Sequence, residues 1–224
     1  MLGLLGKKLG MTQVYDDAGA VHPVTVVELG PCTVVQVKTV ATDGYDALQL
    51  GFGTPKAARL TKPLRGHFEK KSVGLATHLR EFRTARAGEF KVGERLMVTA
   101  FEPGDTVDVK GVTKGRGFQG VMKRCGKHGG PASHGSDFHR RPGSIGMRTW
   151  PGRVPKNMGM PGHMGVENVT TRNLTVIKVR PEENLLFVKG ALPGTTGGIV
   201  AVISRATDFE SRPALKASET AVKE

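Results

Sequence analysis

The chain has 224 residues, of which 38% are hydrophobic, and this is enough to bury a core in one large domain or two small ones, so a disordered polypeptide is not required. Its 33 Lys and Arg residues against 20 Asp and Glu give a net charge of +13, which favours an anionic partner, with nucleic acid first. Only two cysteines are present, which argues against a disulfide scaffold, and no apolar run reaches the length of a membrane span. At the N-terminus the first basic residues follow the apolar ones, which is the reverse of the order in a secretory signal. The sequence therefore predicts a cytoplasmic protein.

The first 110 residues are predicted to be mainly strands. Short β-branched runs alternate there with Gly, Pro or Asp turns, as in an antiparallel sheet or barrel. The runs are 22–29, 33–38, 45–52, 96–101 and 106–110. Between them, Leu60, Leu64 and Phe68 recur at helical spacing within 56–71, and Pro63 restricts this short helix to a start near residue 62.

Residues 111–165 differ from the rest of the chain in charge and in pattern. They hold ten Lys or Arg residues, one acid (Asp137) and 14 glycines, so this quarter of the chain carries +9 of the net charge. They show neither helical nor strand periodicity and cannot bury a core of their own. A loop of this length is expected to be functional or ordered by a partner. A flexible linker is the alternative, but linkers are rarely so cationic.

After this loop the strand pattern returns. The runs are 173–180, 184–190 and 198–203, with a hairpin turn at Pro181–Asn184. Strands on both sides of the loop are therefore expected to belong to one barrel. The predicted organisation is a discontinuous β-barrel domain (1–110 and 166–205), an inserted extended basic loop (111–165) and a flexible C-terminal tail (206–224).

The residues expected to bind nucleic acid are the cations, several histidines and the tryptophan of the loop. Lys and Arg neutralise phosphates, whereas His and Trp donate to phosphates or stack on unpaired bases. These residues are Lys114, Arg116, Lys123, Arg124, Lys127, His128, His134, His139, Arg140, Arg141, Arg148, Trp150, Arg153 and Lys156. A buried core position is the alternative for Trp150, but its arginine, proline and glycine neighbours argue against it.

Three other chemistries fit the loop less well. Gly115–Gly120 satisfies the G-x-G-x-x-G dinucleotide fingerprint, but too few residues follow for the helix of a βαβ unit. Cys125 and the later histidines have ligand-like spacing without a matched second pair or nearby carboxylates, so no metal site is predicted. Neighbouring Ser, His and Asp residues point apart on an extended chain, and we predict no catalytic residue, no enzyme activity, no cofactor and no small-molecule substrate.

Runs of residues along nearly the whole chain, up to about residue 204, follow a family pattern. They include Gly3-Leu-Leu-Gly-Lys-Lys-Leu-Gly-Met-Thr12, Gly130-Pro-Ala-Ser-His-Gly-Ser136, His139-Arg-Arg-Pro-Gly-Ser-Ile-Gly146, Gly159-Met-Pro-Gly-His163 and Asn184-Leu-Leu-Phe-Val-Lys-Gly-Ala-Leu-Pro-Gly194. Together with Gly115-Arg-Gly117 and the residues around it, these runs resemble the bacterial-type ribosomal protein L3 (uL3) family of the large ribosomal subunit.

The resemblance implies a translation-factor-like antiparallel β-barrel and a basic loop that runs through 23S rRNA towards the peptidyl transferase centre. It implies a structural constituent of the large (50S) subunit that binds early in assembly and neighbours ribosomal proteins L14 and L19. Some bacterial members carry a methylated glutamine where this chain has Thr149, so that modification is expected to be absent. A free-standing RNA-binding assembly or regulatory protein with the same barrel is the alternative.

Overall fold

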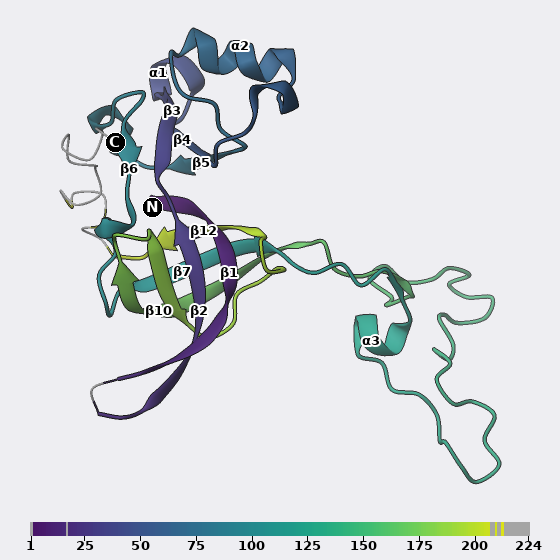
Figure 1. The fold of residues 1–224 in the computed structure, drawn as a ribbon. Coiled ribbons are helices and arrows are strands. Elements are labelled where there is room, and N and C mark those ends of the chain that lie inside the picture. Colours follow the sequence, from purple (N-terminus) through teal and green to yellow (C-terminus); the bar gives the residue numbers. More distant parts are fainter. Residues whose placement is uncertain (1, 17, 207–208, 210–211, 213–224) are drawn as a thin grey trace. The chain divides into compact units, whose positions relative to one another are not determined.

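The structure, a computed structural model, describes residues 2–16, 18–206, 209 and 212. The chain divides into two compact units (Figure 1): unit 1 is Met1–Val112 with Asn168–Glu224, and unit 2 is Thr113–Glu167. Unit 2 spans nearly the same residues as the cationic loop 111–165. The predicted flexible tail, 206–224, lies for the most part outside the described residues, with Ala206, Phe209 and Arg212 as the exceptions.

Six strands of unit 1 form a closed antiparallel barrel. Around the ring they are β1 (Gly3–Tyr15), β12 (Ile199–Ser204), β7 (Thr106–Val112), β10 (Asn168–Arg180), β11 (Leu185–Lys189) and β2 (Val21–Leu29), and β2 pairs with β1 to close it. The strands before and after unit 2, β7 and β10, pair directly, with Val112 opposite Asn168. The two chain positions between which unit 2 is inserted therefore lie side by side.

A second antiparallel sheet in unit 1 has the strand order β5 (His78–Arg83), β4 (Ala47–Phe52), β3 (Cys32–Lys38) and β6 (Arg95–Leu96). The helix α2 (Lys62–Lys70) packs Phe68 against Val35 and Ala76 of this region. The shorter helical elements are α1 (Val40–Asp43), η1 (Ala57–Arg59), η2 (Ala87–Glu89) and η3 (Val98–Ala100).

The barrel and the second sheet share one apolar core. The start of β1 is buried on both faces, because the consecutive residues Leu4 and Leu5 point to opposite faces of the strand and are exposed by only 0% and 2%. The amide of Leu5 also donates to the Cys32 thiol of β3. A Cβ at Gly3 would collide with the carbonyl oxygen of Val202. Glycine at this position therefore lets β1 approach its neighbour closely.

The mainly β class with an antiparallel barrel is confirmed, and so are most of the predicted strands. The runs 22–29, 33–38, 45–52, 106–110, 173–180, 184–190 and 198–203 correspond to β2, β3, β4, β7, β10, β11 and β12. The hairpin turn is also present, since the amide of Asn184 donates to the carbonyl of Pro181 at 3.1 Å. The helix begins at Lys62, as Pro63 predicted.

The prediction of a strand over 96–101 is wrong beyond its first residue. Only Arg95 and Leu96 pair with β3, and Val98–Ala100 forms the 3-10 helix η3. Leu96, Val98 and Ala100 are all fully buried, so the apolar residues of this run do fill the core. After Leu96, however, the chain forms a 3-10 helix instead of pairing with β3. In unit 1, two strands were not predicted, β1 and β5, and the two short strands of unit 2 were not predicted either.

Unit 2 has little regular structure and almost no interior. Its elements are β8 (Phe118–Gln119), α3 (Val121–Cys125) and β9 (Gly162–His163). Val121 is the only buried residue of 113–167, a stretch that the structure describes throughout. This confirms that the segment buries no core of its own. Over the described residues of the whole chain, no helix is long and apolar enough to cross a membrane.

Candidate nucleic-acid interface

The two ends of unit 2 are joined by a ladder of backbone hydrogen bonds. The amide of Thr113 donates to the carbonyl of Glu167 at 2.9 Å, and Arg116 and Met164 are linked through the amide of Arg116 at 2.9 Å. Farther along, Phe118 is in register with His163. The outgoing and returning chains thus run antiparallel at the base of unit 2, so its middle residues form one closed excursion.

Gly165 allows this ladder to form. Its φ is +84°, and a Cβ at this position would collide with the carbonyl oxygen of Lys114 on the opposite chain. Both the left-handed backbone at Gly165 and its close approach to the outgoing segment at Lys114 require glycine. Close approach alone applies at Gly130, whose amide donates to the carbonyl of His139 at 2.8 Å and where a Cβ would lie 2.5 Å from the Phe138 ring.

Two of the predicted cations hold unit 2 together. Arg124, on α3, donates from Nε to the carbonyl of His163 at 3.1 Å and from Nη1 to the carbonyl of Met160 at 2.8 Å. Lys127 lies just after α3 and directs its Nζ at the Met158 sulfur, 3.6 Å away. Arg124 therefore ties α3 to the returning chain.

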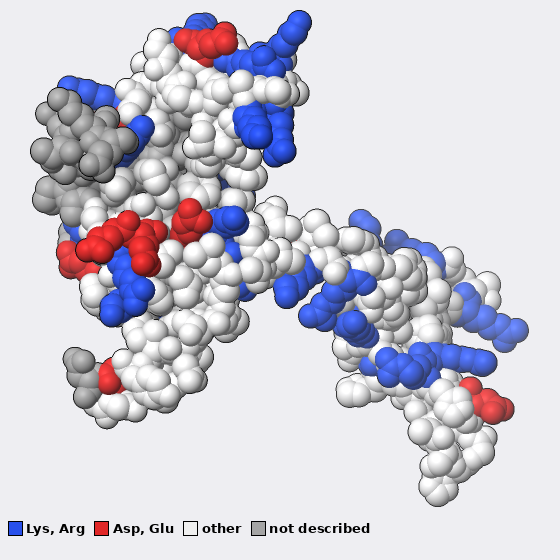
Figure 2. Space-filling view, in the orientation of Figure 1, with Lys and Arg blue, Asp and Glu red and all other residues white. Residues whose placement is uncertain are grey.

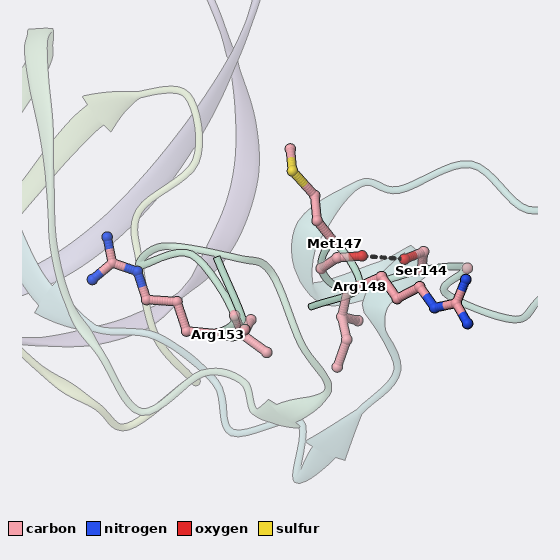
Figure 3. Close-up of a pocket in the computed structure, with 9 residues that line it drawn as sticks. Ser144, Met147, Arg148 and Arg153 are labelled. Carbon is pink, nitrogen blue, oxygen red and sulfur yellow. Dashed lines mark hydrogen bonds between the residues drawn. The ribbon is translucent and has the colours of Figure 1, made fainter. Parts of the chain in front are cut away.

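The far part of unit 2 exposes its side chains. The hydroxyl of Ser144 donates to the carbonyl of Gly146 at 2.7 Å and tightens the turn before Met147. An open hollow is lined here by residues 143–148 and 152–154. Figure 3 shows the guanidinium groups of Arg148 and Arg153 extending in opposite directions from it. Cations on both sides of a concave, glycine-lined backbone suit close approach of an anionic chain.

Two large apolar side chains beside this hollow are solvated. Trp150 is 87% exposed and Met147 is 76% exposed. This excludes the alternative that Trp150 plugs the core. An exposed indole between two arginines can stack on an unpaired base.

The charge of unit 2 is strongly positive and uncompensated. Its ten Lys and Arg residues face two acids, Asp137 and Glu167, for a net charge of +8. No ion pair involves any of these ten within the described part of the chain. Figure 2 shows the Lys and Arg side chains distributed over most of unit 2. The Lys and Arg side chains of unit 2 therefore repel one another unless an anionic partner neutralises their charge.

Comparisons with known proteins identify the family of this chain. The profile described as Ribosomal protein L3 matches residues 72–185. A protein of Brachyspira pilosicoli, the "Large ribosomal subunit protein uL3", is 50% identical over 206 residues, which cover 92% of this chain and 94% of that protein. The chain belongs to the ribosomal protein L3 family. This confirms the identification made from the sequence motifs.

In this member of the L3 family, the predicted nucleic-acid-binding residues lie on the surface of unit 2. Of the fourteen, Lys127 is half-buried and the others are exposed. The side chains of Arg140, Arg141, Arg148 and Arg153 make no hydrogen bond to any described protein atom. The structure thus separates Arg124 and Lys127, which contact the protein, from cations that extend into solvent.

The two most exposed large apolar residues of this surface after Trp150 were not among the predicted binding residues. Phe118, in the base ladder, and Met147, beside the hollow, are each 76% exposed. A large apolar side chain flanked by glycine and arginine in a segment without a core was the available sequence signal.

The alternative chemistries find little support in the structure. The glycines of the dinucleotide motif lie around the base ladder, and the helix that follows, α3, has five residues and ends at Gly126 with a φ of +66°. This is not a βαβ unit. No cluster of three His, Cys, Asp or Glu residues suited to a metal ion occurs among the described residues.

Proposed function

We propose that this L3-family protein is a structural constituent of the large ribosomal subunit whose unit 2 binds 23S rRNA. The observation that carries the proposal is the net charge of +8 on a segment with one buried residue and no ion pair among the described residues. Such a segment cannot stabilise itself by an apolar core, and phosphates supply the missing counter-charge.

Glycines and arginines have complementary tasks in this proposal. Glycine lets the backbone approach packed RNA closely, and the free guanidinium groups replace the counterions between neighbouring phosphates. Arg140, Arg141, Arg148 and Arg153 position the segment by phosphate contacts, while Trp150 stacks on an unpaired base.

The finer assignments follow from family membership. We propose that unit 2 extends towards the peptidyl transferase centre, that the protein joins the subunit early in its assembly, and that ribosomal proteins L14 and L19 are its neighbours. The role is structural rather than enzymatic. A free-standing RNA-binding or regulatory protein with this fold is the competing function.

The first experiment measures binding to a transcript of the 3′ region of 23S rRNA over a range of KCl concentrations. Replacing Arg140, Arg141, Arg148 and Arg153 by Gln should weaken binding and flatten the plot of log K against log salt by about one unit per residue. The matched control replaces four exposed cations of unit 1 by Gln: Arg86, Lys91, Lys178 and Lys189. Equal slopes for the two variants would refute the role of unit 2.

The second experiment separates a resident component from a free-standing protein. Quantitative mass spectrometry across a sucrose gradient of lysate, before and after a high-salt wash, should find the protein in a 1:1 ratio with other large-subunit proteins. Its presence mainly in free fractions would favour the assembly or regulatory role instead.

A further inference from the structure

The chain has a second concentration of positive charge, in unit 1. Residues 56–71 hold six basic residues and one acid, Glu69. Outside this segment and unit 2, the chain contains 17 basic and 17 acidic residues. The net positive charge of the chain therefore comes from unit 2 and from residues 56–71, which we name the α2 segment.

The α2 segment is held firmly on the second sheet. Phe68 is 1% exposed and packs in a cluster with Val35 and Ala76. His67 Nε2 lies 2.9 Å from the side-chain oxygen of Gln49 on β4. These contacts hold α2 on the sheet, so the exposed cations of the segment are presented by a preorganised support.

Most of these cations are exposed and have no carboxylate partner. Lys56, Arg59, Lys62 and Lys70 are exposed, whereas Arg65 is half-buried and donates from Nε to the carbonyl of Leu60 at 3.2 Å. None of the six basic residues forms an ion pair with a residue that the structure describes. Figure 2 shows Lys and Arg gathered over the region of α2.

The charges of α2 favour the helix dipole at its C-terminal end, where Lys70 lies, but oppose it at the N-terminal end. Lys62 lies in the first turn of α2, which contains no acidic residue, and a cation at a helix N-terminus opposes the helix dipole. Outside this segment, basic and acidic residues of unit 1 are equal in number, and some of them are paired, as Lys38 is with Glu81 at 2.8 Å. A merely solvated helix face would be expected to mix both signs. The α2 segment instead keeps a repulsive arrangement, which an anionic partner would relieve.

We propose that the α2 segment is a second RNA-binding surface, which contacts the sugar-phosphate backbone of double-stranded RNA through Lys56, Arg59, Lys62 and Lys70. This inference rests on the proposed function of the chain as an rRNA-binding protein. The segment exposes no Phe, Tyr or Trp ring, because its one residue of these types, Phe68, is buried. Exposed cations without such a ring suit contacts with phosphates, as in the recognition of RNA helices by shape, whereas unit 2 exposes a tryptophan that can stack on a base.

The test uses the full chain and the same 23S rRNA transcript. The α2 variant combines Arg59→Gln, Lys62→Gln and Lys70→Gln, and its matched control combines Arg86→Gln, Lys91→Gln and Lys178→Gln. All six residues are exposed, and the two variants have the same net charge. Far-ultraviolet circular dichroism and thermal melting verify that both remain folded.

The α2 variant should lose close to one unit of salt slope for each contact removed, or about 2.7 units in all. Raising the salt from 50 to 200 mM should then weaken its binding by about 40-fold less than that of the unsubstituted chain. The control should keep its slope to within one unit. Equal slopes for the α2 variant and the control would overturn the inference.

The outcome for unit 2 is independent. If the four-arginine variant loses slope and the α2 variant does not, the α2 inference fails and the proposed function stands. If only the α2 variant loses slope, the inference stands and the assigned role of unit 2 fails. The α2 variant could instead keep the salt slope of its RNA binding, while ribosomal particles that contain it lose one acidic protein. That result would show that the α2 segment binds a protein and not RNA, and it would overturn the inference.

Discussion

Trp150 gives a sharp test of how unit 2 contacts RNA. It is the single tryptophan of the chain and is 87% exposed, so Trp150→Ala removes almost no packing and should leave the melting temperature unchanged. Stacking of one base on an aromatic side chain is worth about 1–3 kcal/mol. The variant should therefore bind the 23S rRNA transcript about 5- to 150-fold more weakly, whereas Trp150→Phe keeps a ring and should recover most of the affinity.

Two measurements check this reasoning. Filter binding at several salt concentrations gives the affinities and the salt slope. Trp150→Ala should lower the affinity at each concentration without changing the slope, since no charge is removed. The fluorescence of the unsubstituted protein should match that of a fully solvated indole and change when RNA is added. An unaltered affinity for Trp150→Ala would refute stacking, and a fall of several degrees in its melting temperature would show that Trp150 is packed in the free protein.

Three further predictions concern thiol reactivity, acid stability and the C-terminal contacts. Cys125 is exposed, whereas Cys32 is buried and burial raises the pKa of its thiol to about 12. A thiol reagent should therefore modify Cys125 alone until denaturant is added. Bound rRNA should protect Cys125 from the reagent. Burial raises the pKa of Asp105, but the hydrogen bonds from Arg212, at 2.7 and 3.2 Å, and from the Glu102 amide outweigh it and hold that pKa below its usual 3.8. The Asp105–Arg212 pair therefore stabilises the fold above about pH 4, and this stabilisation is lost as the pH falls through the lowered pKa of Asp105. In urea unfolding, Arg212→Ala should lower the free energy of unfolding by about 2 kcal/mol at pH 7 and by progressively less below pH 4. Phe209 is 1% exposed, with its ring centroid 4.6 Å from that of Phe101, and Phe209→Ala should cost about 3–5 kcal/mol in the same assay; a cost below 1 kcal/mol would contradict this packing.

Local pattern was sufficient for much of the fold. Runs of β-branched residues between turn residues located seven strands, and Pro63 located the start of α2, because backbone propensities and fixed dihedral angles act within a few residues. The same approach failed at β5, whose run of charged residues around Phe82 is typical of an edge strand, and β5 is indeed at the edge of its sheet.

The candidate site was predictable in its composition and not in its internal contacts. Counting charges was enough to separate the cationic loop from the rest of the chain, since net charge is a property of composition. Arg124 resembled the other loop cations in sequence, yet its guanidinium group binds the carbonyls of Met160 and His163. Those partners lie more than 30 residues away, and only the folded chain brings them together.

The sequence by itself determined the family, the strand-rich class and the segregation of positive charge into one glycine-rich segment, because each of these depends on residue types and local order. Tertiary structure decided which strands pair to close the barrel, why Leu4 and Leu5 of β1 are both buried, and where Phe209 packs. It also decided that Lys62 and Lys70 of α2 are exposed, whereas Phe68 of the same helix is buried against Val35 and Ala76. These features depend on contacts between segments far apart in the chain, and burial on two faces at once leaves no alternation in the sequence to mark it.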